Sequence, residues 1–290
     1  SAALGAAGAA PPTVEQMRAG AAMSMDAQGV MPAGVSVEEL SVAGVPGLDL
    51  MPNGGRRDRV LLYLHGGGYV LLSARSHAKL AAGIGAAAGC RVVSLDYRLA
   101  PEHPYPAALE DALGAYRWLL GEGYSPEHIA IAGDSAGGGL TMATLLALRN
   151  EGLPQPAAAV PLSPWVDLEG TGTTMDTHAH RDFIVGREAL QGMAALYVGG
   201  GDLRDPLVAP LWADLTGLAP LYIQVGGDET LLDDSTRLAA NAARAGVEVR
   251  LDVFPEMQHV FQTTLGQVPE ADDAIARIGA YLAARLGTQR

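Results

Sequence analysis

The chain has 290 residues, of which 49% are hydrophobic but only 5% aromatic, so its core is expected to consist mainly of Ala, Leu and Val. The 19 Lys and Arg residues are outnumbered by 32 Asp and Glu, and the net charge of −13 argues against nucleic-acid binding, which requires a basic surface. No apolar run approaches the roughly 20 residues that span a bilayer, so we expect no stable membrane association.

The cysteine content and the N-terminus bear on the compartment. Cys90 is the only cysteine, so no disulfide can form within the chain. Because it begins an apolar run, we expect a buried structural thiol rather than a nucleophile. The N-terminus has neither the basic region nor the strong hydrophobic stretch of a secretory signal. Both observations favour a reducing, cytoplasmic location.

The first 50 residues predict one helix and two strands. Residues 1–12 are rich in Ala and Gly and predict a loose start. Residues 13–29 have helical composition, with Thr13 as the expected N-cap. Two placements remain open for this helix: packed on the body of the protein, or a lid that lines a pocket with its methionines. Alternating apolar residues then predict strands over 35–45 and 47–51.

From residue 60 onward, short apolar runs alternate with helical stretches. Strands are predicted over 60–64, 91–97, 129–132, 157–162, 221–225 and 247–253. Helices are predicted over 76–88, 107–120, 136–150, 235–245 and 271–286. This alternation is typical of a parallel sheet with right-handed crossovers. Residues 167–218 break the pattern, and we interpret them as an insertion over the edge where such sheets bind ligands.

The sequence Gly-Asp-Ser-Ala-Gly at 133–137 fits the G-x-S-x-G motif of a nucleophile elbow. It follows the predicted strand 129–132 and leads into the helix 136–150. Glycines two residues away on either side of the serine prevent side chains from colliding in so tight a turn. Ser135 is therefore the predicted nucleophile, and the N-terminus of the following helix points backbone N–H groups at whatever binds to it.

A second glycine motif precedes the elbow. His-Gly-Gly-Gly-Tyr at 65–69 directly follows the strand predicted over 60–64. An HGGG-type motif in this position supplies N–H donors of an oxyanion hole, and the residue after the nucleophile supplies another. The expected donors are Gly67, Gly68 and Ala136.

In sites of this kind, an acid and then a histidine follow the serine along the chain. The strand predicted over 221–225 ends in Gly-Gly-Asp-Glu, where a carboxylate is well placed to orient an imidazole. Asp228 is the predicted acid, because Glu229 is expected to point elsewhere if the turn is tight. Asp233 and Asp234 lie at a predicted helix start, where helix capping explains them.

Of the seven histidines, only His259 lies after Asp228, in a loop that follows the next predicted strand, and we assign it as the base. His65 is expected to brace the glycine loop. His178 and His180 could form a metal pair, but they lack a third ligand, so no metal and no cofactor are expected.

The chain resembles the hormone-sensitive-lipase family of esterases, members of the alpha/beta hydrolase superfamily. Four blocks carry the resemblance: residues 65–69, 96–111 and 133–138, and the pair Asp228 and His259. The block 96–111 is the most specific, because no general chemistry demands it. One departure is Glu229-Thr230 after Asp228, where many family members carry an apolar pair such as Pro-Leu.

The resemblance implies an α/β-hydrolase fold, in which a mostly parallel twisted sheet is flanked by helices and covered by a small helical cap. The cap is expected to comprise residues 1–34 and the insertion at about 167–218, with the rest of 35–290 forming the hydrolase domain. The residues predicted to contact substrate are Tyr69, Asp134, Trp165, Phe183 and Tyr197. Further candidates for the pocket lining are Ile184, Trp212, Met17, Met23 and Met25.

We therefore expect a serine carboxylesterase for short- to medium-chain acyl esters. Ser135 would attack the carbonyl, His259 would carry the proton and Asp228 would orient the imidazole. A lactone hydrolase, for example for terpenoid lactones, would use the same chemistry and remains open. A non-catalytic small-molecule receptor is a remote alternative, since receptors of this fold have lost the histidine. The resemblance also leaves a homodimer open, paired through the last strand and helix.

Overall fold

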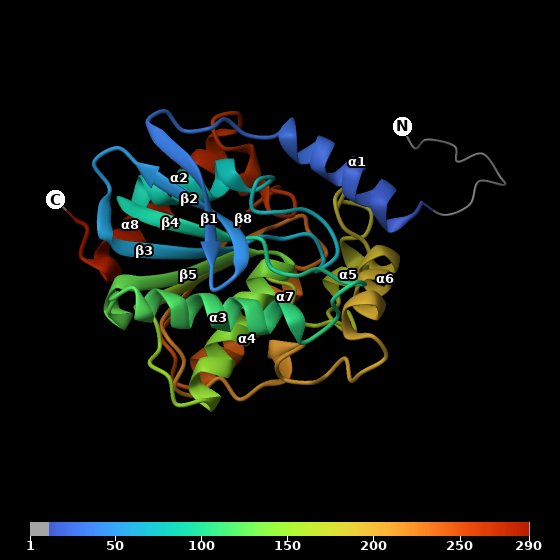
Figure 1. The fold of residues 1–290 in the computed structure, drawn as a ribbon. Coiled ribbons are helices and arrows are strands. Elements are labelled where there is room, and N and C mark those ends of the chain that lie inside the picture. Colours follow the sequence, from blue (N-terminus) through green and yellow to red (C-terminus); the bar gives the residue numbers. More distant parts are fainter. Residues whose placement is uncertain (1–11, 290) are drawn as a thin grey trace.

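An eight-stranded sheet runs through the computed structural model, which describes residues 12–289 (Figure 1). The strand order is β1-β2-β4-β3-β5-β6-β7-β8. The pairs β1–β2 and β2–β4 are antiparallel, and all other neighbours are parallel. The strands are β1 (Val35–Val42), β2 (Val45–Pro52), β3 (Arg56–Leu64), β4 (Cys90–Leu95), β5 (Ile129–Asp134), β6 (Ala158–Leu162), β7 (Leu221–Gly226) and β8 (Val249–Phe254).

Helices cover both faces of this sheet. The α-helices are α1 (Val14–Asp26), α2 (Ala78–Ala88), α3 (Ala107–Gly121), α4 (Ala136–Asn150), α5 (Thr174–Thr177), α6 (Arg187–Val198), α7 (Leu232–Arg244) and α8 (Pro269–Leu286). Apolar side chains of α2 and α8 pack into one core cluster with strand residues, and those of α3, α4 and α7 pack into another. The predicted mostly parallel sheet with flanking helices is confirmed.

The central strands and α4 are buried because they consist mainly of apolar residues. Residues 60–64 of β3 and 129–132 of β5 are fully buried, as expected of apolar strands covered on both faces. In α4, every residue from Ala136 to Leu148 is buried, so this helix carries no solvent-facing polar stripe. Cys90 is also fully buried at the start of β4, and burial raises the pKa of its thiol to about 12.

The helix α1 begins as predicted at Thr13. The Thr13 hydroxyl accepts the N–H of Gln16, and the Gln16 side chain accepts the N–H of Thr13, which completes a capping box. The expected loose start falls on residues 1–12, of which 1–11 lie outside the described residues. In Figure 1, α1 lies on the same side of the sheet as α5 and α6, the helices of the segment 167–218.

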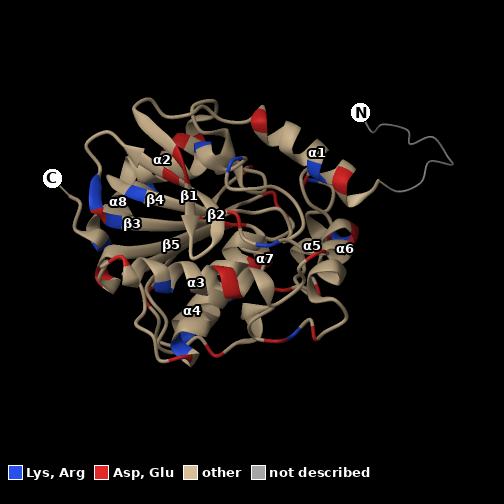
Figure 2. Cartoon of the chain, viewed as in Figure 1, with Lys and Arg blue, Asp and Glu red and all other residues tan. Residues whose placement is uncertain are grey.

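Charged residues lie mainly on outer helix surfaces and in loops, with both signs interspersed (Figure 2). Within residues 12–289, no helix combines the length and the apolar character that crossing a membrane requires.

Candidate active site

Ser135 lies in the sharp turn between β5 and α4. Its backbone angles, φ +54° and ψ −120°, are strained for a residue with a side chain. The turn is held from both sides, because the N–H of Ser135 donates to the carbonyl of Leu162 at 2.8 Å and its carbonyl accepts the N–H of Trp165 at 2.9 Å. The backbone strain at Ser135 is thus supported by the strand and loop that follow α4 in the sequence.

The two flanking glycines of the motif are required by close backbone approach. A Cβ at Gly133 would lie 2.3 Å from the carbonyl oxygen of Gly137. A Cβ at Gly137 would lie 2.0 Å from the carbonyl oxygen of Leu64 and 2.5 Å from that of His65. Both distances are far below van der Waals contact, so the expected steric role of these glycines is present in the structure.

We expect Gly137→Ala to destabilise the protein by at least about 1–3 kcal/mol, since the new methyl group meets backbone rather than a flexible side chain. Urea unfolding followed by circular dichroism measures the change. Gly114→Ala in α3 is the matched control, because no atom lies within 4 Å of its added Cβ. The control should gain up to about 1 kcal/mol from helix propensity. Equal stabilities of the two variants would contradict the steric argument.

His259 follows β8 and brings its imidazole to the serine. Its Nε2 lies 2.9 Å from Ser135 Oγ, and its Nδ1 lies 2.6 Å from Glu229 Oε2. An ionised carboxylate only accepts hydrogen bonds, so Nδ1 carries the proton and Nε2 is left to accept from the Ser135 hydroxyl. Burial lowers the pKa of His259, but the Glu229 carboxylate outweighs this and leaves the pKa above its ordinary value of 6.5.

The assignment of Asp228 is corrected by this geometry. Asp228 does not contact His259; its carboxylate is partly exposed and pairs with Arg181 at 3.3 Å. Its N–H donates to the carbonyl of Met257 at 3.1 Å. The carboxylate beside His259 belongs to Glu229, the next residue, whose longer side chain folds back toward the end of β7.

The Glu229 carboxylate is fully buried and held at both oxygens. Oε2 faces His259, while Oε1 accepts the N–H of Gly226 at 2.6 Å and the hydroxyl of Ser163 at 2.7 Å. These bonds replace the hydration that a buried carboxylate loses. In the sequence, the departure Glu229-Thr230 from the family pattern only weakens the assignment of Asp228, and nothing there singles out Ser163.

The loop that carries the triple glycine lies beside the elbow. Gly67 and Gly68 adopt positive φ angles of +113° and +64°, and both line the same cavity as Ser135. Among the described residues, their N–H groups have no hydrogen-bond acceptor. Ala136 is the first residue of α4, where backbone N–H groups have no partner within the helix. Three candidate donors therefore lie around the serine.

His65 braces this loop, as expected. Its ring stacks on Tyr97 with centroids 4.3 Å apart, and its Nδ1 lies 2.7 Å from the carbonyl oxygen of Gly66. Burial lowers the pKa of His65 to about 3, so the ring is neutral. Tyr97 donates its hydroxyl to the carbonyl of His65 at 2.6 Å. Tyr97 lies in the 96–111 block, which thus supports the glycine loop directly.

Asp134, predicted to contact substrate, is instead occupied by protein groups. Oδ1 accepts the Tyr63 hydroxyl at 2.7 Å and the N–H of Gly66 at 3.1 Å, and Oδ2 lies 3.2 Å from Nε2 of His77. The charge of His77 overcomes burial and lowers the pKa of Asp134, and the same pairing raises the pKa of His77. Asp134 and His77 both line the cavity. The bond from Gly66 joins Asp134 to the glycine loop, and the pairing with His77 joins it to the start of α2.

A cavity of about 360 Å³ opens at Ser135 and His259. It is lined by the glycine loop, by α1 and by apolar residues of the insertion. The apolar lining residues include Met25, Leu71, Leu72, Phe183, Ile184, Val185, Leu190, Met193 and Val260. Of the predicted lining residues, Phe183, Ile184 and Met25 are therefore found in the cavity. The helix α1 has no buried residue and contributes Ala21, Ser24 and Met25, so it forms a wall of the cavity rather than part of the core.

Arg18 fixes α1 to the body beside the cavity. Its guanidinium donates to the carbonyl of Val70 at 2.8 Å, to the carbonyl of Ala100 at 3.0 Å and to both carboxylate oxygens of Glu102 at 2.7 Å. Bidentate pairing of this kind gives a defined orientation as well as attraction. Lys79 holds the other end of this wall, where its ammonium donates to the carbonyl of Asp26 at 2.8 Å.

Three aromatic residues predicted to contact substrate lie in the core instead. The ring of Tyr69 stacks on that of Tyr197 with centroids 3.7 Å apart, and the ring centroids of Tyr69 and Trp165 are 6.2 Å apart. All three side chains are essentially inaccessible, and none lines the cavity at Ser135. Because Tyr197 lies in α6 and Tyr69 in the glycine loop, their stacked rings pack the segment 167–218 against that loop.

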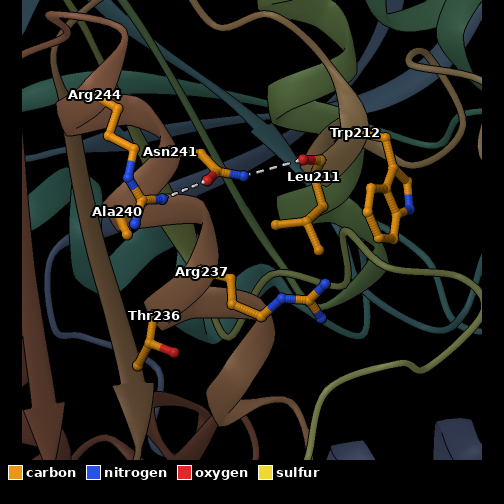
Figure 3. A pocket seen from close by; sticks show the side chains of 7 residues that line it. All are labelled: Leu211, Trp212, Thr236, Arg237, Ala240, Asn241 and Arg244. Carbon is orange, nitrogen blue, oxygen red and sulfur yellow. Dashed lines mark hydrogen bonds between the residues drawn. The ribbon is translucent and has the colours of Figure 1, made fainter.

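Trp212 and the paired histidines also lie outside the cavity. Trp212 lines a separate surface pocket with Arg237, drawn in Figure 3, and the guanidinium of Arg204 lies 4.6 Å from its ring centroid. His178 ends the short helix α5 and contacts the Thr177 hydroxyl. In the part of the chain that the structure describes, no three His, Cys, Asp or Glu side chains come together as a candidate metal site.

Comparison with known proteins gives one family and several relatives. The family model described as alpha/beta hydrolase fold matches residues 61–263. An acetyl-hydrolase from Streptomyces hygroscopicus is 48% identical over 229 residues, which cover 79% of this chain and 77% of the relative. An esterase from Acinetobacter venetianus is 34% identical, with 85% of this chain and 82% of the relative covered.

Solved structures of esterases are also similar to this chain. The crystal structure of an esterase from the bacterial hormone-sensitive lipase family matches with a TM-score of 0.93 at 48% identity, over 97% of this chain and 94% of the other. A crystal of EstE5 soaked with p-nitrophenyl butyrate matches with a TM-score of 0.91 at 40% identity, over 97% and 94% of the two chains.

Proposed function

Because the chain belongs to the alpha/beta hydrolase family, in its hormone-sensitive-lipase branch, we propose that it is a serine carboxylesterase whose triad is Ser135, His259 and Glu229. The observation that carries the triad is the unbroken chain of hydrogen bonds, 2.9 Å from serine to imidazole and 2.6 Å from imidazole to carboxylate. Relatives named as esterases and acetyl-hydrolases support the reaction class.

In the proposed acylation step, the Ser135 oxygen attacks the ester carbonyl while Nε2 of His259 takes its proton. Glu229 holds the Nδ1 proton and stabilises the imidazolium that forms. The developing oxyanion accepts hydrogen bonds from the N–H groups of Gly67, Gly68 and Ala136, each worth roughly 2.7–4 kcal/mol in the transition state. His259 then protonates the leaving alcohol, and water releases the acyl group by the same route.

The cavity supports small esters as substrates. A volume of about 360 Å³ with mostly apolar lining suits a short acyl chain and a small alcohol. Two relatives point the same way, since one is named an acetyl-hydrolase and a crystal of another was soaked with p-nitrophenyl butyrate. We propose that α1 and the segment 167–218 form the cap that sets this volume.

The substrate proposal predicts a maximum in a series of p-nitrophenyl esters from acetate to laurate. Each methylene that enters the cavity adds about 0.8 kcal/mol, so kcat/KM should rise about fourfold per carbon at first. It should then fall once the chain meets the walls, between butyrate and octanoate. A steady rise to laurate would contradict a cavity of this size.

The same panel decides between ester and lactone. γ- and δ-Lactones of matched carbon number are measured beside the linear esters, with Ser135→Ala as the blank. Linear esters should exceed the lactones in kcat/KM. The reverse order would favour the lactone hydrolase that shares this mechanism. No turnover of any compound by the wild-type protein would contradict the proposed esterase.

A further inference from the structure

The five residues 163–167 follow β6 and lie beside the proposed triad. They form hydrogen bonds with Ser135, with Glu229 and with the residue next to His259. Ser163 donates its hydroxyl to Glu229 at 2.7 Å and accepts the N–H of Val260, the residue after His259, at 3.2 Å. Two residues on, the N–H of Trp165 donates to the carbonyl of Ser135 at 2.9 Å. A single short segment therefore joins acid, base and nucleophile.

Ser163 is held in a costly conformation to make these contacts. Its φ is +42°, unusual for a residue with a side chain, and its side chain is fully buried. Its N–H donates to the carbonyl of Gln224 in β7 at 2.7 Å, so its position is fixed by the strand that leads to Glu229. The hydroxyl is satisfied as both donor and acceptor, and its donor bond goes to the oxygen of Glu229 that does not face His259.

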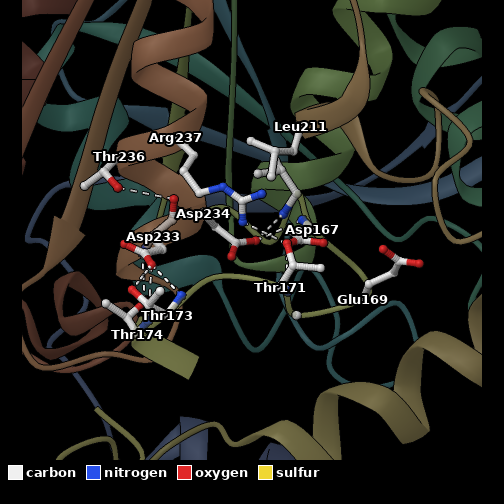
Figure 4. Close-up of polar contacts among 12 residues, drawn as sticks. Asp167, Glu169, Thr171, Thr173, Thr174, Leu211, Asp233, Asp234, Thr236 and Arg237 are labelled. Carbon is white, nitrogen blue, oxygen red and sulfur yellow. Dashed lines mark hydrogen bonds and ion pairs between the residues drawn. The ribbon is translucent and has the colours of Figure 1, made fainter. Parts of the chain in front are cut away.

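The far end of the segment is anchored by Asp234, near the start of α7. One oxygen of Asp234, Oδ2, accepts the N–H groups of both Val166 and Asp167 at 2.9 Å. Asp234 lies five residues after Glu229, on the helix that the Glu229 loop enters. Figure 4 shows Asp234, in the first turn of α7, beside Asp167. The anchor therefore ties the segment to the same loop that carries the acid.

Two buried carboxylates, those of Asp167 and Asp234, lie close together at this anchor, and Arg237 pairs with Asp167. Asp167 Oδ2 accepts from the Thr171 N–H and hydroxyl and from Arg237, whereas Asp167 Oδ1 is buried without a partner among the described residues. Burial raises the pKa of Asp234 to about 8, the two backbone N–H groups lower it and the charge of Asp167 raises it. When protonated, Asp234 still accepts from the two N–H groups and adds no second buried charge beside Asp167.

We propose that the segment 163–167 is a positioning strap for the active site, in which Ser163 orients Glu229 and Asp234 anchors the far end. The proposal rests on the proposed triad. Neither residue lines the cavity at Ser135, so both would act through Glu229 and the elbow. Loss of either should lower kcat with little change in KM, because the cavity walls remain in place.

The first test compares Ser163→Ala and Ser163→Gly on p-nitrophenyl butyrate. Both remove the hydroxyl, but glycine also relieves the positive φ. Both should lower kcat about 10- to 100-fold, as expected for one hydrogen bond to a charged group. The low-field proton NMR resonance of His259 Nδ1–H should shift in both variants. Wild-type kcat in either variant would overturn the role of Ser163.

The second test uses the conservative variant at the anchor. Asp234→Asn keeps an oxygen for the two N–H groups and should retain kcat within about threefold, whereas Asp234→Ala should lose about tenfold or more. Glu169→Gln, which alters an exposed ion pair with Arg204 nearby, is the control and should resemble wild type. Equal kcat for Asp234→Ala and wild type would overturn the anchor.

Stability against pH gives a readout that does not need activity. The pKa of Asp234 is about 8 when folded and 3.8 ordinarily, so between these values the folded state holds one more proton than the unfolded state. The unfolding constant of wild type should therefore rise about tenfold per pH unit relative to Asp234→Asn, from pH 5 to 7.5. Parallel curves would overturn the protonated anchor. This readout and the NMR shift stand even if wild type hydrolyses no ester, which would contradict only the proposed function.

Discussion

Replacing Ser135 by alanine is expected to lower kcat about 10⁴- to 10⁶-fold while leaving the fold intact. In the proposed mechanism this hydroxyl forms the acyl-enzyme, and the catalysis that remains without it would come from the oxyanion donors and binding. Alanine keeps the cost of φ +54° roughly unchanged, so the melting temperature should stay close to wild type. Steady-state hydrolysis of p-nitrophenyl butyrate measures the loss.

A covalent readout separates this result from a simple loss of binding. The wild-type protein, mixed with p-nitrophenyl butyrate and quenched within its burst phase, should gain the mass of one butyryl group on the peptide that contains Ser135. The Ser135→Ala variant should gain none. Equal turnover by the two proteins would exclude the serine mechanism. Acylation of another peptide would show that the nucleophile is a residue other than Ser135.

The second large effect is expected at Glu229 and not at Asp228. Glu229→Gln keeps the shape of the side chain but can present an N–H₂ group to Nδ1, which favours the wrong tautomer of His259. A comparable change at the acid of a serine protease lowers kcat about 10⁴-fold, and we expect about 10³- to 10⁴-fold here. Asp228→Asn should change kcat less than about fivefold, because it loses only an exposed ion pair.

The pH profile gives the same comparison an independent readout. His259 must be neutral to accept the serine proton, so kcat/KM of wild type should fall as pH decreases through a pKa above 6.5. In Glu229→Gln the raising charge is gone while burial remains, so this acidic limb should move to lower pH. Asp228→Asn should keep the wild-type limb. A shift in Asp228→Asn with none in Glu229→Gln would restore Asp228 as the acid.

The secondary structure could be predicted from sequence because its signals are local. The strands at 60–64 and 129–132 are uninterrupted apolar runs, and the helix at 136–150 has the bounds that its composition predicts. Ser135 and the glycine loop could also be located, since steric demands at a tight turn select glycine at defined offsets. Chain order then pointed to His259, which lies at the serine in the structure.

The errors concern side chains whose direction depends on distant contacts. Asp228 and Glu229 are adjacent carboxylates, and the choice between them depends on bonds to Ser163 and Gly226 that no local pattern reveals. Likewise Tyr69 and Phe183 are both large aromatic residues. Tyr69 stacks on Tyr197 in the core, whereas Phe183 lines the cavity. Which of them is buried depends on tertiary contacts that the local sequence does not reveal.

The position of α1 outside the core has a consequence for how this enzyme can change. No residue of this helix is fully buried, yet it supplies one wall of the cavity and is held in place in part by Arg18. Substitutions at Ala21, Ser24 or Met25 can therefore alter which esters fit without weakening the packed interior. At these positions of α1, the size of the cavity can therefore change separately from the stability of the core.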